Sequence, residues 1–154
     1  MPEASVVTSP IAASRYASPF ECSWKRAGSG AAWVHVAGEL DLANTYQLSQ
    51  ALRDAQLYAR VVVLDLRKLT FIESRGVHAI LDAARGMRRG DGRLVLVRGP
   101  AQVDRVLTLT GVPSQVLIVD LHPSEAPVRA LLHLAHRAGL SSRTGQQRSR
   151  ARTH

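Results

Sequence analysis

An apolar and largely β-branched run at residues 61–66 is followed closely by an amphipathic repeat that begins at Ser74. Such a run is typical of a strand buried on both faces, and the repeat places apolar side chains at the i, i+3, i+4 and i+7 spacing of one helical face. The side chains of this stripe are Val77, Ile80, Leu81 and Ala84. The sequence therefore predicts a strand, a short loop and a helix, with Ser74 in the N-cap position.

The same alternation of strands and helices extends over most of the chain. In order, we expect strands at 20–25 and 31–37, a helix from near Asn44, a strand at 61–66, a helix from Ser74 to Gly90, a strand at 93–97, a helix from Pro100 to Gly111, a strand at 115–119 and a helix from 124–127 to Gly139. A turn-rich link between the first two strands predicts a β-hairpin, while the longer later connections imply parallel strands. The predicted fold class is α/β, a mostly parallel sheet with an N-terminal antiparallel edge hairpin and four helices.

Side-chain patterns predict finer details. The strand at 20–25 alternates apolar and polar residues, so we expect it at the sheet edge, with Cys22 as a buried or half-buried structural thiol. The residues expected to be buried are Leu48, Ala51, Leu52 and Ala55 on the first helix and Val128, Leu131, Leu132 and Ala135 on the last. Loops at 38–42 and 68–74 follow strands predicted to be parallel, which would place Asp41 and Ser74 on one edge of the molecule.

The two ends of the chain predict no regular structure. Residues 1–18 are rich in Ala, Ser and Pro without apolar periodicity, and residues 140–154 hold a single leucine among mostly Ser, Arg, Gly, Gln and Thr. We therefore expect a disordered leader, one domain at 19–139 and a disordered tail. No apolar run reaches the roughly 18 residues of a membrane span and no signal-peptide pattern occurs, which predicts a cytoplasmic protein without membrane insertion.

The net charge of +8 raises the question of nucleic-acid binding. Half of this excess lies at 139–154, where four arginines occur without an acidic residue. No aromatic residues are interleaved with these arginines, so the stacking platform of a single-strand binder is missing. We expect no specific nucleic-acid partner.

The serine at the strand-to-helix joint does not predict a hydrolase. A nucleophile elbow has the pattern G-x-S-x-G, and Ile72 occupies the position of its first glycine. His78 lies one helical turn beyond Ser74 and would have to reach back past the helix start to act as its base. No phosphate-binding glycine motif occurs, and His133 and His136 lack the further ligands of a metal site. We expect no enzyme activity, no cofactor and no metal.

Two roles for Ser74 fit these observations. As a plain N-cap it would stabilise its helix by about 1 kcal/mol. Alternatively, free backbone N–H groups and the positive end of the helix dipole meet there, so an oxyanion attached to Ser74 would be well accommodated. Composition and spacing alone favour the plain cap.

Three stretches resemble the STAS domain of bacterial anti-sigma-factor antagonists. Residues 34–42 (VHVAGELDL) are similar to a strand followed by the family's G-E-L/I-D turn. Residues 61–66 followed by 71–77 (FIESRGV) are similar to the family's strand, loop and D-S-S/T-G phosphorylation motif. Residues 103–112 resemble the helix before the family's last strand, and the whole resemblance covers residues 20–137.

The resemblance implies a non-enzymatic regulatory domain that binds an anti-sigma factor with serine kinase activity and thereby releases a sigma factor. By position, Ser74 is the phosphoacceptor whose modification switches the domain off, and a serine phosphatase would reactivate it. The partner-binding residues expected from the motifs are Glu39, Leu40, Asp41, Asn44, Glu73, Arg75, Gly76 and His78.

Two residues depart from the family motif. Glu73 replaces the aspartate before the serine, and Arg75 replaces the serine or threonine after it. An arginine in the first helical turn opposes the dipole unless an anion offsets it, and Arg75 could pair with a phosphate on Ser74 or with Glu73. The alternative is a constitutive, non-phosphorylated STAS interaction module that acts as a scaffold or as a subunit of another complex.

Overall fold

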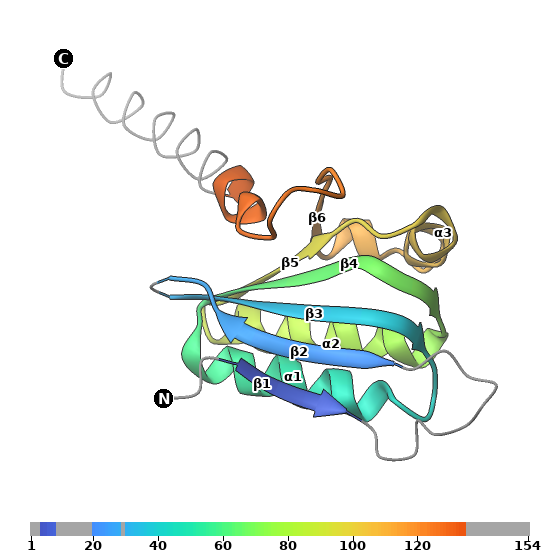
Figure 1. Ribbon diagram of the computed structural model, residues 1–154, viewed down its shortest axis with the longest axis horizontal. Coiled ribbons are helices and arrows are strands. Elements are labelled where there is room, and N and C mark those ends of the chain that lie inside the picture. The colour runs from blue at the N-terminus through green and yellow to red at the C-terminus, as the bar shows by residue number, and fades with distance from the viewer. Residues whose placement is uncertain (1–3, 9–19, 29, 135–154) are drawn as a thin grey trace.

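The structure, a computed structural model, describes residues 4–8, 20–28 and 30–134. Within them, six strands form one sheet in the order β1-β2-β3-β4-β5-β6 (Figure 1). The strands are β1 (Ala4–Thr8), β2 (Glu21–Arg26), β3 (Ala31–Leu40), β4 (Val61–Ile72), β5 (Arg93–Val97) and β6 (Leu117–Val119). The helices are α1 (Thr45–Tyr58), α2 (Ser74–Arg89) and α3 (Ala101–Leu109), with a 3-10 turn η1 (Val112–Ser114) and a helical segment at 129–134.

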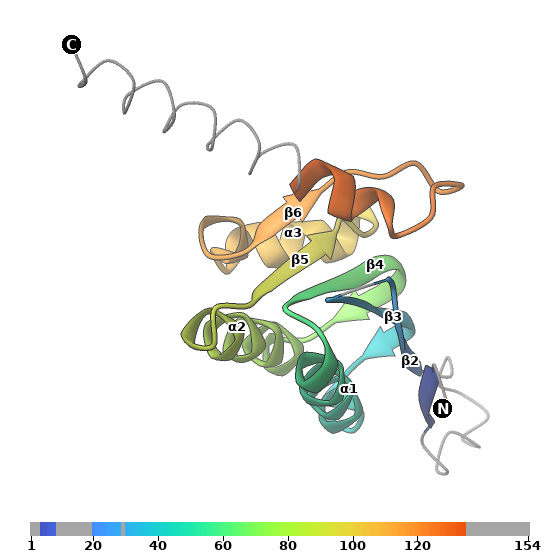
Figure 2. The same cartoon turned by 90° about the vertical axis from the view of Figure 1, so that its left-hand side faces the viewer.

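The pairing of the strands confirms the predicted fold class. β2 and β3 form the expected antiparallel hairpin, and β3, β4, β5 and β6 pair in parallel. Helices α1 and α2 lie side by side on one face of the sheet, and the 129–134 segment lies on the other side (Figure 2). The fold is therefore α/β, with a sheet that is antiparallel at one edge and parallel elsewhere.

The main core lies between the sheet and the helices. The stripes predicted for the first two helices are buried in it: Leu48, Ala51, Leu52 and Ala55 on α1, and Val77, Ile80, Leu81 and Ala84 on α2. Full burial of one large aliphatic side chain stabilises the fold by about 1.5–3 kcal/mol. Cys22 is 1% exposed, and its burial raises the pKa of the thiol to about 12, which confirms the predicted buried thiol.

The strand β2 is not the edge strand that the sequence predicted. β1 pairs with it in antiparallel orientation, within the segment expected to be a disordered leader. The alternation in β2 has another cause. Cys22 and Trp24 belong to the main core, while the intervening Ser23 and Lys25 point to the face that the helices leave open. The apolar and polar residues of β2 alternate because one face of the sheet is uncovered, and not because β2 is an edge strand.

A smaller core lies on the face away from α1 and α2. Its buried members are Val63, Val95, Val97, Val119 and Ala130. The 129–134 segment covers this core with Ala130 and with half-buried Leu131 and Leu134.

The buried face predicted for the last helix is wrong at two positions. Val128 is 42% exposed and Leu132 is 56% exposed. The helix begins only at 129, and it approaches the sheet through the small side chain of Ala130, which turns Leu132 outward. Ala135 and the predicted tail at 140–154 lie outside the described residues.

β4 is longer than the sequence predicted. It continues to Ile72 instead of ending at 66, and its second half pairs with the end of β3 beyond two register shifts. Most of the loops expected at 38–42 and 68–74 is therefore strand. Only residues 41–44 and Glu73 connect these strands to the helices that follow.

The end of α3 follows local sequence rules. Gly111 has a φ of +78°, the left-handed conformation expected of a residue just past a helix end. The turn η1 follows directly and delays the last strand, so that β6 begins at Leu117 rather than at 115.

Candidate partner-binding site

The carboxyl ends of β3 and β4 lie next to each other at one edge of the sheet. Leu40 and Ile72 are register partners, and the backbone N–H of Glu73 donates to the carbonyl oxygen of Leu40 at 3.1 Å. The 41–44 loop and the start of α2 are thus held together. This confirms that the two predicted segments share one edge of the molecule.

The 41–44 loop is closed by its own side chains. The Asp41 carboxylate accepts hydrogen bonds from the backbone N–H groups of Ala43 and Asn44 at 3.0 and 3.3 Å. The Asn44 side chain accepts from the Asp41 N–H at 2.9 Å and donates to the carbonyl oxygen of Glu39 at 2.7 Å. Asp41 and Asn44 therefore fix the shape of the loop, because their polar groups are largely satisfied within it.

Glu73, rather than Ser74, is the N-cap of α2. Its backbone is extended, with φ −95° and ψ 166°, and its carbonyl oxygen accepts the first helical hydrogen bond, from Val77 at 3.2 Å. Ser74 is the first helical residue, so the predicted capping role is wrong. The Glu73 carboxylate does not cap its own helix and instead accepts from the backbone N–H of Leu42 at 3.1 Å. The glutamate thus ties the two loops together.

The structure separates the predicted partner-binding residues into surface and buried groups. Ser74, Arg75 and His78 are exposed, and Glu39, Asp41, Asn44 and Glu73 are half-buried. Leu40 and Gly76 are buried and cannot contact a partner directly, which corrects the prediction for both. They pack against each other beneath the surface, where a Cβ atom added at Gly76 would lie 2.7 Å from the Cδ2 atom of Leu40.

The N-terminus of α2 is open to an anion. The helix has no side-chain hydrogen bond at its cap and no acidic residue in its first turn. The Ser74 side chain is exposed at this end, next to the exposed side chain of Arg75. Free N–H groups and the helix dipole favour negative charge at such a position, and an arginine there can form paired hydrogen bonds with a phosphate.

Two large exposed side chains at this edge are not among the partner-binding residues named from the motifs, although one of them lies in the predicted 39–44 segment. Leu42 is 59% exposed in the loop that Glu73 holds, and Tyr46 is 69% exposed in the first turn of α1. Tyr46 lies on α1 outside its buried stripe and Leu42 precedes the helix, so a large apolar side chain away from the stripe was the signal that could have identified them. Large apolar and aromatic side chains are typical anchors of protein interfaces.

The link between Glu73 and Leu42 predicts a measurable loss of stability. Glu73→Ala is expected to lower the free energy of unfolding by about 1 kcal/mol and to speed amide hydrogen exchange at Leu42, because that N–H loses its acceptor. Urea unfolding and exchange measured by NMR check the two effects. Glu21→Ala, at an exposed residue of β2, is the matched control and should change neither. Unaltered exchange at Leu42 in Glu73→Ala would contradict the assigned contact.

Neither a metal centre nor a membrane span is found in the described part of the chain. At 4–8, 20–28 and 30–134, no three His, Cys, Asp or Glu side chains come together as a metal-binding group. No helix in these ranges is long and apolar enough to cross a bilayer. His133 is exposed, and His136 lies outside the described residues.

Comparison with known proteins gives one family and a set of similar structures. The family model "STAS domain" matches residues 26–126. The anti-sigma factor antagonist SpoIIAA in its unphosphorylated form is 21% identical over 71% of this chain and 94% of its own, with a TM-score of 0.59. An anti-sigma factor antagonist from Mycobacterium paratuberculosis is 18% identical over 84% of this chain and 92% of its own, also with a TM-score of 0.59.

A third structure, the Bacillus cell fate determinant SpoIIAA in its phosphorylated form, is 20% identical over 71% of this chain and 97% of its own, with a TM-score of 0.56. At these identities the similarity establishes a common fold. A search of curated proteins found no match.

Proposed function

Because the chain belongs to the STAS domain family, we propose that it is an anti-sigma-factor antagonist controlled by phosphorylation of Ser74. Its domain, proposed to comprise residues 19–139 together with β1, binds an anti-sigma factor that is also a serine kinase, and this binding releases a sigma factor. Phosphorylation by the kinase ends the binding, and a serine phosphatase restores it. The role is non-enzymatic, needs no cofactor, inserts in no membrane, involves no specific nucleic acid and is exercised in the cytoplasm.

The observation that carries this proposal is the position of Ser74. The serine is exposed at the N-terminus of α2, where no side chain hydrogen-bonds the helix end, and the neighbouring loop presents Leu42 at the same edge. A kinase can reach such a hydroxyl, and the helix end accommodates the product. The proposed partner-binding surface consists of Glu39, Asp41, Leu42, Asn44, Tyr46, Glu73, Ser74, Arg75 and His78.

Electrostatics explains how one phosphate would end the binding. Phosphorylation adds a charge of about −1.5 to −2 at the centre of the proposed surface. Glu39, Asp41 and Glu73 already contribute carboxylates there, so the modified surface becomes strongly acidic. A partner that packs against the small hydroxyl would then meet a bulky, hydrated dianion, and the contact would lose both its packing and its charge balance.

A charged substitution should reproduce part of this effect. Ser74→Glu is expected to weaken binding of the anti-sigma factor by at least roughly tenfold, equivalent to about 1.4 kcal/mol, and isothermal titration calorimetry measures the change. Ser114→Glu is the matched control. Ser114 is also exposed, but it precedes β6 and so lies at the amino ends of the parallel strands, whereas Ser74 lies at their carboxyl ends. Equal affinities of wild-type protein and Ser74→Glu would show that this edge is not the switch.

A pull-down from the source cell tests the class of function. Wild-type protein and Ser74→Ala are both expected to retain an anti-sigma factor with kinase activity, since the alanine keeps the surface uncharged. The proposal would be contradicted if neither wild-type protein nor Ser74→Ala retained a kinase-like protein.

The exposed Arg75 supports a second candidate, a constitutive interaction module that is never phosphorylated. The residue replaces the small hydroxyl residue of the family motif, and a kinase specific for that motif would meet a long cation instead. Mass spectrometry of the protein from its own cells distinguishes the two candidates. Absence of phosphate on Ser74 under every growth condition favours the constitutive module.

A further inference from the structure

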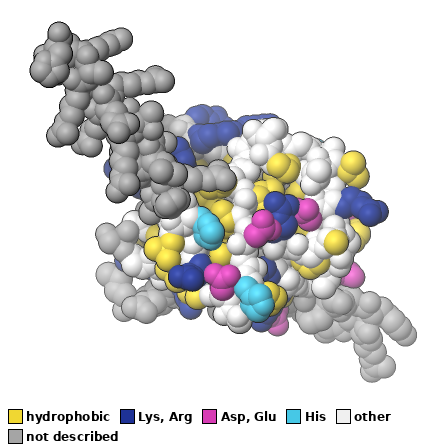
Figure 3. Space-filling view, turned by 90° about the horizontal axis from the view of Figure 1, so that it is seen from above, with side chains coloured by type: hydrophobic (Ala, Val, Ile, Leu, Met, Phe, Trp, Pro, Cys, Tyr) yellow, Lys and Arg dark blue, Asp and Glu magenta, His cyan; other side chains and the backbone are white. Residues whose placement is uncertain are grey.

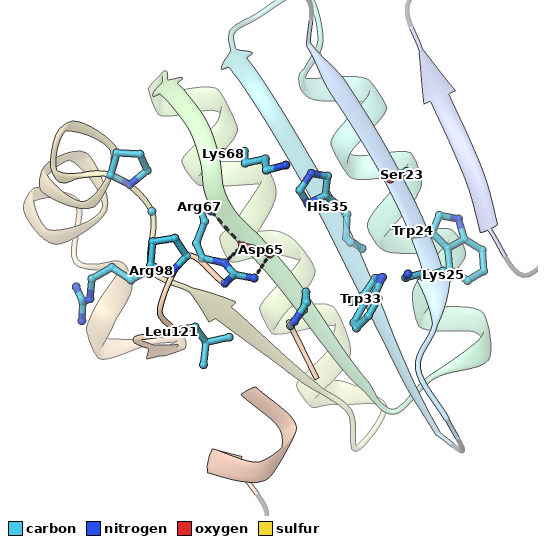
Figure 4. A pocket seen from close by; sticks show the side chains of 15 residues that line it. Ser23, Trp24, Lys25, Trp33, His35, Asp65, Arg67, Lys68, Arg98 and Leu121 are labelled. Carbon is cyan, nitrogen blue, oxygen red and sulfur yellow. Dashed lines mark hydrogen bonds and ion pairs between the residues drawn. The ribbon is translucent and has the colours of Figure 1, made fainter. Parts of the chain in front are cut away.

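The open face of the sheet carries a cavity that is separate from the proposed partner-binding surface. Its volume is about 710 Å³, within the range of roughly 300–1,000 Å³ that is usual for small-molecule sites. β2, β3 and β4 line it together with the segment that follows β6 (Figure 4). None of the residues proposed to bind the anti-sigma factor lies in its wall. Seen from above the orientation of Figure 1, the surface shows basic, acidic and hydrophobic side chains close together (Figure 3).

Part of the cavity wall is apolar. Trp33 of β3 and Leu121 are half-buried and pack against the smaller core, and Pro123 and Pro127 line the same space. This wall suits the hydrocarbon part of a ligand, because each Å² of apolar surface that it removes from water favours binding.

Two arginines in the wall are already paired. Arg67 holds both oxygens of Asp65, with nitrogen–oxygen distances of 3.0 and 2.8 Å, and this hydrogen bonding raises the pKa of its guanidinium. Arg98 pairs at 2.6 Å with both Asp104 and Asp120. These arginines organise the wall and have little capacity left for a ligand.

Two lysines in the wall have no carboxylate partner within the described residues. Lys68 is exposed and extends from β4 toward His35 on β3 (Figure 4). Lys25 reaches over the ring of Trp33, with its Nζ atom 4.1 Å from the ring centroid. Among the residues that the structure describes, Asp65 is the only acidic one that lines the cavity, and Arg67 neutralises it. The cavity therefore combines an apolar wall with unpaired positive charge.

A row of residues across this face resembles a catalytic triad but does not have its geometry. Ser23, His35 and Asp65 are register neighbours on β2, β3 and β4. A triad needs the aspartate to orient the histidine, and here both Asp65 oxygens bind Arg67. Within the described residues no hydrogen bond joins His35 to either neighbour. The arrangement fits binding rather than bond cleavage.

We propose that this cavity binds a small amphipathic organic anion. Lys25 and Lys68 supply the positive charge that attracts the acid group, and the apolar body lies against Trp33 and Leu121. Charge complementarity therefore selects an external anion. This site is independent of Ser74 and of the proposed regulatory role.

Fluorescence titration with 8-anilinonaphthalene-1-sulfonate tests the proposal on the full chain. The probe carries one sulfonate on an aromatic body, and N-phenyl-1-naphthylamine has the same body without the charge. Wild-type protein is expected to bind the sulfonate at one site. The double variant Lys25→Gln/Lys68→Gln should bind it at least roughly tenfold more weakly, while its affinity for the neutral probe stays the same.

Two further variants serve as controls. Lys25→Arg/Lys68→Arg keeps both charges and should restore binding, and Arg53→Gln removes an exposed cation from α1, on the other face of the sheet, and should leave binding unchanged. Urea midpoints equal to wild type show that the variants are folded. A loss smaller than tenfold in the double glutamine variant, an equal loss for the neutral probe, or an equal loss in Arg53→Gln would overturn the proposal.

Discussion

Asp65→Asn is expected to lower the free energy of unfolding by about 3–5 kcal/mol, the cost of leaving one partner of a buried ion pair without the other. The Asp65 and Arg67 side chains are only 4% and 15% exposed, and they form a two-pronged pair. Arg67 also donates to the carbonyl oxygens of His122 and Glu125 at 2.7 and 2.6 Å. The pair thus holds the turn before the last helix against the sheet, and its loss should loosen that turn. Urea unfolding followed by circular dichroism measures the change.

The matched control for this prediction is Asp82→Asn. Asp82 pairs with Arg85, three residues further along α2. The Asp82 and Arg85 side chains are 76% and 50% exposed, and their nitrogen–oxygen distance is 3.7 Å. Exposed pairs of this kind contribute about 0–1 kcal/mol, so the control should be close to wild type. Similar losses in Asp65→Asn and Asp82→Asn would contradict the structural role assigned to the buried pair.

Gly76→Val is expected to destabilise the fold by roughly 1–3 kcal/mol through overpacking. A Cβ atom at this position would lie 2.7 Å from Leu40 Cδ2 and 3.0 Å from Ile72 Cγ1. Leu40 is fully buried and Ile72 is 3% exposed, so neither side chain can move without disturbing the core. Because both residues end the strands that carry the proposed surface, the same variant should bind the anti-sigma factor more weakly. Urea unfolding and calorimetric titration measure the two effects.

Gly86→Val provides the control in the same helix. A Cβ atom at Gly86 would meet no heavy atom within 4 Å, and valine has a better helix propensity than glycine. We expect its stability to stay within about 0.5 kcal/mol of wild type or to rise slightly. If both valine variants were equally stable, the close packing of Gly76 against Leu40 and Ile72 would be refuted.

Helical periodicity correctly predicted the buried faces of the helices that pack against the main core. The stripes of α1 and α2 were identified correctly because both helices bury the same repeating side chains against the sheet. Gly111 was identified from a rule that depends only on the backbone conformation at a helix end. The parallel sheet followed from the lengths of the connections, which local turns cannot span.

Elements that depend on distant pairing could not be predicted. The strand at 4–8 exists through hydrogen bonds to β2. Its β-branched run, Val6 to Thr8, is only three residues long and does not stand out from the Ala, Ser and Pro around it. The second half of β4 contains Arg67 and Lys68, which look like loop residues unless it is known that one face of the sheet is open there. In the last helix, contact through Ala130 overrides the spacing of the larger side chains.

In the candidate site too, local motifs were predicted correctly and contacts between distant segments were not. Sequence motifs located Ser74 and the adjacent turn, but capping preferences assigned the N-cap to the serine rather than to Glu73. The deciding contact is the bond from Leu42 to the Glu73 carboxylate, which spans 31 positions in the sequence. The sequence also did not predict that Leu40 and Gly76 are buried, because their burial results from the ends of β3 and β4 meeting under α2.

The most direct measurement of the central proposal is transfer of phosphate to Ser74. Purified protein is incubated with the anti-sigma factor recovered in the pull-down and with MgATP, and intact mass and peptide fragmentation are then recorded. We expect one added phosphate on wild-type protein, located at Ser74, the same addition to Ser114→Ala, and none on Ser74→Ala. Undiminished transfer to Ser74→Ala, or a phosphate on another residue of the wild-type protein, would contradict it.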